Sequence, residues 1–294
     1  MKNLKLAAVC LSCLTMTGCS ALNFSVEGLI NAPKLTSEQS EIHQALIESV
    51  GSNITLKYPK NGEYRSAYVI ANIDDEPADE AMVFYEYTSN GSEEDGLRVN
   101  ILDKDEDGKW YSVKELAGAG TDIDQVIISP MGSNNQTDVF VGYQNLTNDE
   151  KTMEIYSYTD GDFKRVALDT YSVLEPLDIN NDGYIELITI QRSTNNDTGA
   201  VTAKASMLNM KNDEITRGEN VDMCDNVTSY VSSKTGMLDS GRRAIFIDGL
   251  TADGKLQTEI IYYRYSGLQN PMQLRSEKLL PLCTRPAGYY SEDM

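Results

Sequence analysis

A β-rich unit recurs four times along this chain, and no other feature of the sequence restricts the possible folds as strongly. After residue 53, apolar residues stand in short runs separated by Gly, Asp and Asn, which is the pattern of strands joined by tight turns. One strand of each unit carries the same apolar pattern, and each is preceded by a leading strand and followed by a hairpin. These strands begin at Glu80, Asp138, Glu186 and Arg243, at spacings of 58, 48 and 57 residues.

About four strands in roughly 50 residues is the size of one blade of a β-propeller. A blade cannot bury both of its faces alone, so neighbouring blades must stack on each other. We therefore predict an all-β fold over residues 53–294, a propeller of about four four-stranded blades. A β-sandwich is the alternative, because turn spacing alone fits both folds.

One short helix is expected before the repeats, over residues 36–52. Thr36 and Gln39 fit a capping box at its start. Its apolar residues recur at helical spacing, and His43 lies just off their stripe, so we expect His43 to be a surface or boundary residue. The apolar stripe consists of Ile42, Ala45, Leu46 and Val50.

The first 18 residues have the pattern of a secretory signal peptide. Lys2 and Lys5 precede a short apolar run, and small residues stand directly before Cys19. The run is too short to cross a bilayer as a stable helix, which needs about 20 residues. The segment resembles the bacterial lipobox, which implies cleavage before Cys19 and lipidation of its thiol. We expect residues 1–18 to be removed, residues 19–35 to form a tether, and the protein to be anchored at the extracytoplasmic face of the cell membrane; an ordinary secreted protein is the alternative.

The charge and the few reactive side chains exclude several classes of protein. The formal net charge of −20 repels nucleic acid and attracts divalent cations. A single histidine, His43, leaves almost no room for histidine-based triads or zinc sites. Cys224 and Cys283 either pair as one disulfide or remain separate buried thiols.

Residues 178–186 alternate oxygen-bearing side chains in the pattern D-x-N-x-D-G-x-x-E. An EF-hand is excluded, because Thr189 stands where a bidentate Glu is needed and a strand-like run follows instead of a helix. Gly183 permits a tight bend, and hard oxygen ligands suit calcium better than zinc or copper. The expected calcium ligands are Asp178, Asn180, Asp182, Glu186 and the backbone carbonyl of Tyr184.

This loop resembles the FG-GAP or VCBS-type repeat, the calcium-loop blade of integrin-like propellers and many bacterial surface proteins, and the chain as a whole resembles VCBS-repeat lipoproteins of clostridia-like bacteria. The loop of the first unit aligns without a gap, but Pro77 replaces the glycine and puts the tight bend in doubt. The second and fourth loops have lost most carboxylates, and Arg242 and Arg243 would repel a cation at the fourth, so we expect hydrogen bonds alone to hold these two loops. The weaker site consists of Asn72, Asp74, Glu76, the carbonyl of Ala78, and Glu80.

Two further segments look like metal loops. Residues 103–109, DKDEDGK, fit an ordinary hairpin turn better, because Asp and Gly are favoured turn residues. The final residues, PAGYYSEDM, resemble the run into the loop at 178, so we predict that the sequence stops as a fifth loop begins.

The resemblance implies location and fold, and it specifies no reaction. We expect a calcium-stabilised surface binding or scaffold protein whose partner is an envelope glycan or protein, and no nucleic-acid partner. The alternatives are a carbohydrate-active enzyme on a propeller scaffold, which would need two facing carboxylates, and a purely structural envelope protein. The sequence contains no nucleophile motif, phosphate loop or cofactor fingerprint.

Overall fold

The computed structural model of this protein describes residues 35–88, 96–130, 137–145, 150–194, 197, 201–211, 214–225 and 227–271. The predictions for the signal peptide, Cys19, most of the tether, Cys283 and the fifth loop lie outside these residues. The chain divides into two compact units, residues 1–40 and 41–294. Within the described ranges, no helix combines the length and the apolar character that a membrane crossing requires.

The predicted helix is confirmed as α3 (Ser37–Val50). Its capping box is reciprocal, because Gln39 N donates to Thr36 Oγ1 and Thr36 N donates to Gln39 Oε1, both at 3.1 Å. Gly51 ends the helix with a φ of 85°. Ile42, Ala45 and Leu46 are buried as predicted. His43 is half-buried at the edge of this apolar stripe, and its Nδ1 lies 2.8 Å from the hydroxyl of Tyr68.

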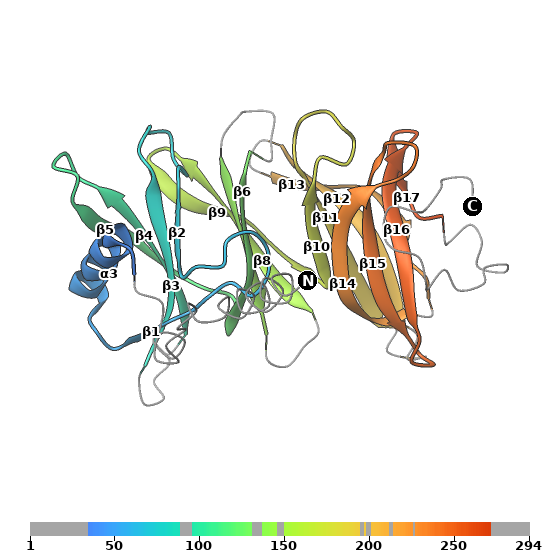
Figure 1. The fold of residues 1–294 in the computed structure, drawn as a ribbon, viewed down its shortest axis with the longest axis horizontal. Coiled ribbons are helices and arrows are strands. Elements are labelled where there is room, and N and C mark those ends of the chain that lie inside the picture. The colour runs from blue at the N-terminus through green and yellow to red at the C-terminus, as the bar shows by residue number, and fades with distance from the viewer. Residues whose placement is uncertain are drawn as a thin grey trace, which may run out of the picture. The chain divides into compact units, whose positions relative to one another are not determined.

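The seventeen strands of the described residues belong to four antiparallel sheets (Figure 1). The first sheet contains β1 (Ile54–Leu56), β2 (Tyr68–Ala71), β3 (Glu80–Tyr87), β4 (Leu97–Lys104) and β5 (Trp110–Ala117). The second contains β6 (Asp122–Ser129), β7 (Asp138–Gln144), β8 (Lys151–Thr159) and β9 (Asp162–Tyr171). The third contains β10 (Val173–Leu177), β11 (Glu186–Thr194), β12 (Val201–Lys211) and β13 (Glu214–Asp222). The fourth contains β14 (Val227–Met237), β15 (Arg243–Thr251), β16 (Leu256–Arg264) and β17 (Gly267–Gln269).

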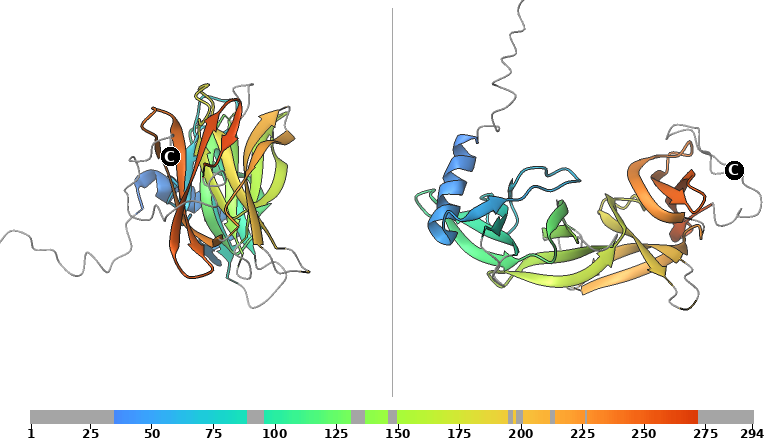
Figure 2. Two further views of the ribbon diagram at one scale, coloured as in Figure 1. Left: turned by 90° about the vertical axis from the view of Figure 1, so that its right-hand side faces the viewer. Right: turned by 90° about the horizontal axis from the view of Figure 1, so that it is seen from below.

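Each sheet is built from consecutive strands, as in a propeller blade. In the right-hand view of Figure 2, the colours of the strands change from blue to red in chain order from one sheet to the next. The described strands do not form a β-sandwich, in which the chain would pass back and forth between two sheets. The four predicted repeat starts are confirmed at the residue level. Strands β3, β7, β11 and β15 begin at Glu80, Asp138, Glu186 and Arg243.

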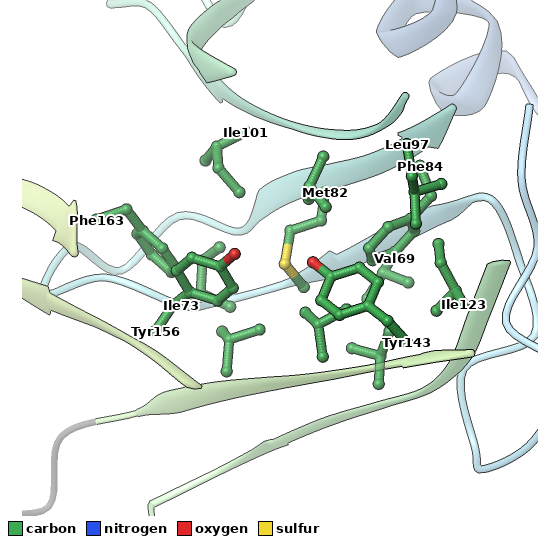
Figure 3. Close-up of a cluster of buried hydrophobic side chains, with 14 residues drawn as sticks. Val69, Ile73, Met82, Phe84, Leu97, Ile101, Ile123, Tyr143, Tyr156 and Phe163 are labelled. Carbon is green, nitrogen blue, oxygen red and sulfur yellow. The ribbon is translucent and has the colours of Figure 1, made fainter. Parts of the chain in front are cut away.

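Hydrophobic clusters connect each sheet to the next one along the chain. The cluster between the first and second sheets contains Met82 and Phe84 of β3 and Tyr143 of β7 (Figure 3). Separate clusters join the second sheet to the third and the third to the fourth. Among the described residues, no cluster joins the first sheet to the fourth. The packing is therefore that of neighbouring blades, each of which covers the apolar face of the next.

The first sheet has an interrupted edge strand, which the sequence did not predict. β1 and β2 pair with the same edge of β3, with Leu56 opposite Tyr85 and Tyr68 opposite Val83. Residues 57–67, which we call the inserted loop, leave this edge and reach β6. There Lys60 N donates to the carbonyl of Ile123 at 3.1 Å, and the next residue's N donates to the carbonyl of Asp124 at 2.7 Å.

Candidate functional site

The structure brings together the side chains predicted as calcium ligands between β10 and β11. The carboxylate of Asp178 accepts hydrogen bonds from the backbone N of Asp182 at 3.0 Å and of Gly183 at 3.2 Å. The amide nitrogen of Asn180 donates to Asp182 Oδ2 and to Glu186 Oε1, both at 2.9 Å. Gly183 has a φ of 95°, which explains why glycine stands at this bend.

Tyr184 joins this group through its backbone, because its N donates to Asp182 Oδ1 at 2.9 Å, while its side chain is exposed. Glu186 lies at the buried base of the loop, where its Oε2 accepts a hydrogen bond from Ile179 N at 3.0 Å. Burial raises the pKa of Glu186 to about 7, and the nearby Asp182 and Asp178 add to the increase. The loop therefore holds more negative charge than its own groups can neutralise.

Arg243 was expected to repel a cation at the fourth loop, and its observed partner lies in the third loop. Its Nη1 lies 3.1 Å from Asp178 Oδ2 and donates to the backbone carbonyl of Asp178 at 3.0 Å. Arg243 occupies the position in β15 that Glu186 occupies in β11. The fourth repeat thus supplies a cation to one end of the third loop.

The loop of the first repeat has the same hydrogen bond between its closing glutamate and a backbone N near its start. Ile73 N donates to Glu80 Oε2 at 2.8 Å, as Ile179 N does to Glu186. Asn72 Nδ2 donates to the carbonyls of Glu76 and Ala78, and Glu76 N donates to Asp74 Oδ1 at 2.7 Å. The loop makes its bend without any residue at positive φ, which removes the doubt that Pro77 raised.

Glu80 is the least satisfied group of this loop. It is 3% exposed, its Oε1 has no hydrogen-bond partner, and burial raises its pKa to about 7, helped by Asp74 and Asp103. A buried carboxylate oxygen without a partner is costly unless a cation or a proton joins it. The ligand chemistry of both loops fits a hard cation such as calcium. In the described part of the chain, however, no three Asp, Glu, His or Cys side chains form a ready-made metal site.

Hydrogen bonds are present in the fourth loop and in the turn at residues 103–109, which is the predicted hairpin between β4 and β5. Leu238 N donates to the carbonyl of Arg242 at 2.9 Å in the fourth loop. Asp105 Oδ1 accepts bonds from the N atoms of Asp107 and Lys109, at 3.0 and 2.9 Å, and closes the β4–β5 hairpin. Residues 131–136 of the second loop lie outside the described part. The adjoining Asp138 accepts a hydrogen bond from the Ser157 hydroxyl.

A cavity of about 650 Å³ forms a second candidate site, and the sequence analysis missed it. The first strands of the second, third and fourth sheets, β6, β10 and β14, line it together with residues 61–64 of the inserted loop. All four repeats therefore contribute to one cavity. Its size lies within the range of ordinary ligand pockets, about 300–1,000 Å³.

Asp124 of β6 is the most heavily bonded group of the cavity wall. It is 2% exposed, and its Oδ1 accepts bonds from Asn61 Nδ2 and Lys151 Nζ, both at 2.8 Å. Its Oδ2 accepts a bond from the Tyr171 hydroxyl at 2.6 Å. Gly142 leaves the space for that hydroxyl, because a Cβ at this position would collide with it. The only sequence signal for this group was an acidic residue inside the apolar run of β6.

Glu175 of β10 lines the same cavity with far fewer partners. Its Oε1 accepts a hydrogen bond from the hydroxyl of Ser233 in β14. Burial raises the pKa of Glu175, and the Ser233 bond offsets only part of this increase. Among the described residues, no lysine or arginine forms an ion pair with it.

Cys224 has no disulfide partner among the described residues, and its predicted partner Cys283 lies outside them. Burial raises the pKa of the Cys224 thiol to about 12, and the neighbouring Glu259 adds to this increase. A reduced Cys224 is therefore protonated at neutral pH. The disulfide stays a prediction.

Comparison with known proteins identifies no family for this chain. No family model matches it, and no curated protein matches it significantly. One similar solved structure is a Bacteroides fragilis protein named for 6-phosphogluconolactonase activity, with 10% sequence identity and a TM-score of 0.34 over 76% of this chain and 67% of that one. This similarity is too weak to support an inference. The class that the fold itself defines is a repeat protein of four blade-like antiparallel sheets.

Proposed function

We propose that this protein is a calcium-stabilised binding or scaffold protein held at the extracytoplasmic face of the cell membrane by a lipid on Cys19. The observation that supports the calcium part most directly is the buried Oε1 of Glu80, which has no hydrogen-bond partner. The same hydrogen bond in the third repeat places Glu186 in an equivalent position. A divalent cation at either loop would neutralise carboxylates that burial makes costly.

The ligands proposed for the third loop are Asp178, Asn180, Asp182, Glu186 and the carbonyl of Tyr184. Asn180 presents its amide nitrogen to two carboxylates, and its amide oxygen accepts a hydrogen bond from Asp182 N at 2.9 Å. A half-turn of this amide would break that bond and present the oxygen to a cation instead. The first loop would use Asn72, Asp74, Glu76 and Glu80. The VCBS or FG-GAP resemblance belongs to this proposal, as does an envelope glycan or protein as the partner.

Calorimetry of the full chain in detergent tests the calcium part. A metal that binds only the folded state stabilises it by about 2.7 kcal/mol at one hundred times its Kd. For a chain of this size we expect calcium to raise the melting temperature by about 5–10 °C relative to EGTA. A double variant, Glu80→Gln with Glu186→Gln, should lose this response, while the exposed Glu106→Gln should keep it.

A melting temperature that neither calcium nor EGTA changes would contradict the calcium part. The anchor is tested separately by mass spectrometry of the membrane-extracted protein. A diacylglyceryl mass on Cys19 is expected, and an unmodified amino terminus elsewhere would contradict it.

A further inference from the structure

We propose that the cavity binds a small aliphatic amine, with the carboxylate of Glu175 as the counter-ion of its ammonium group. This inference rests on the proposed binding function and names the class of ligand. It does not depend on calcium, because none of the proposed calcium ligands lines the cavity.

The charges of the cavity wall are unbalanced. Three carboxylates, Glu63, Asp124 and Glu175, line it together with one ammonium group, that of Lys151. Lys151 is committed to Asp124 at 2.8 Å, and this carboxylate also accepts bonds from Asn61 and Tyr171. The remaining negative charge of the wall belongs to Glu63 and Glu175. The cavity therefore favours a cationic ligand over a neutral or anionic one.

The cavity wall already contains one ammonium group bound to a carboxylate, at Asp124. The Lys151 ammonium lies against this carboxylate and 5.6 Å from the centre of the Tyr171 ring. Glu175 lacks such a partner in the described part of the chain and holds only the Ser233 hydroxyl. An ammonium group from a ligand would complete at Glu175 the ion pair that Lys151 already completes at Asp124.

One exposed apolar side chain of the wall suits methylene groups. Val231 lines the cavity and is 63% exposed, whereas Val126 and Val173 are already buried in the clusters between the sheets. An aliphatic chain that covers such a side chain gains free energy in proportion to the apolar area removed from water. A cation with an aliphatic chain matches this combination of the Glu175 carboxylate and the exposed Val231 side chain.

Isothermal titration of the full chain in detergent with cadaverine tests the proposal, and the neutral 1,5-pentanediol is the matched control. We expect cadaverine to bind and the diol not to bind. Glu175→Gln keeps the shape of the side chain and should weaken cadaverine binding by about 10-fold or more, the usual effect of a charge-assisted hydrogen bond. Glu106→Gln removes the same charge from an exposed turn and should leave the affinity unchanged.

The titration is run both with calcium and with EGTA. If the wild type binds cadaverine but its melting temperature does not respond to calcium, only the calcium part of the proposed function is contradicted. No binding of cadaverine to the wild type, or an equal effect of Glu175→Gln and Glu106→Gln, would overturn the inference. The second outcome would indicate general attraction to a chain of net charge −20.

Discussion

Replacing Glu186 by Gln should stabilise the metal-free protein at alkaline pH and destabilise it relative to wild type when calcium is present. The wild-type carboxylate is 5% exposed, and its loop already carries Asp178 and Asp182. Glutamine keeps the size of the side chain and its hydrogen bond to Ile179 N, but it carries no charge. It therefore removes the cost of burying a carboxylate and also removes a ligand for the metal.

The magnitude follows from the pKa of Glu186, which is 4.5 without perturbation and about 7 in the folded protein. Between these pH values the folded state binds more protons than the unfolded state, so the free energy of unfolding falls as pH rises. The full difference corresponds to about 3 kcal/mol at most. Since Asp182 and its neighbours are exposed to water, which screens part of this interaction, we expect about 1–2 kcal/mol above pH 7.

Urea unfolding at pH 5 and pH 8, in EGTA and in calcium, measures the effect. In EGTA at pH 8, Glu186→Gln should gain about 1–2 kcal/mol over wild type, or about 2–8 °C in melting temperature. This advantage should shrink toward pH 5, where the wild-type carboxylate is protonated in the folded protein. In saturating calcium the order of stability should reverse. A variant less stable than wild type at pH 8 in EGTA would refute the reasoning, because a buried charge would then not be costly at this site.

Two further substitutions test the packing around Tyr171. Gly142→Ala places a methyl group against the Tyr171 hydroxyl and should cost about 1–3 kcal/mol in urea unfolding; an unchanged midpoint would show that the ring moves aside freely. Asp124→Asn leaves the ammonium of Lys151 without its ion pair and should lower the free energy of unfolding by about 2 kcal/mol. The double variant Asp124→Asn with Lys151→Met removes the unpaired ammonium and should recover most of this loss. Equal stability of the single and double variants would contradict this pairing.

The sequence predicted several features that depend on neighbouring residues. Alternating apolar runs and their turns placed the starts of β3, β7, β11 and β15 correctly, because strand periodicity is local. The hydrogen bonds among Asp178, Asn180, Asp182 and Glu186 also form within nine residues, so their spacing predicted their proximity.

The features that escaped prediction depend on residues far apart in the chain. Asp124 accepts hydrogen bonds from three separate segments of the chain, through Asn61, Lys151 and Tyr171. No local sequence pattern predicts contacts between segments so far apart. The inserted loop was missed because residues 57–67 leave their own sheet and bond to the next one. Arg243 was interpreted within its own repeat, whereas its partner Asp178 belongs to the preceding one.

The contact between Arg243 and Asp178 limits how far the four repeats can be made alike. A designer who restored the consensus acid at position 243 would place a third carboxylate beside Asp178 and remove the guanidinium that stands there now. Averaging the repeats, which often improves repeat proteins, would harm this one at the junction between its third and fourth sheets. The arginine that distinguishes the fourth repeat from the others therefore helps to hold the fourth sheet against the third.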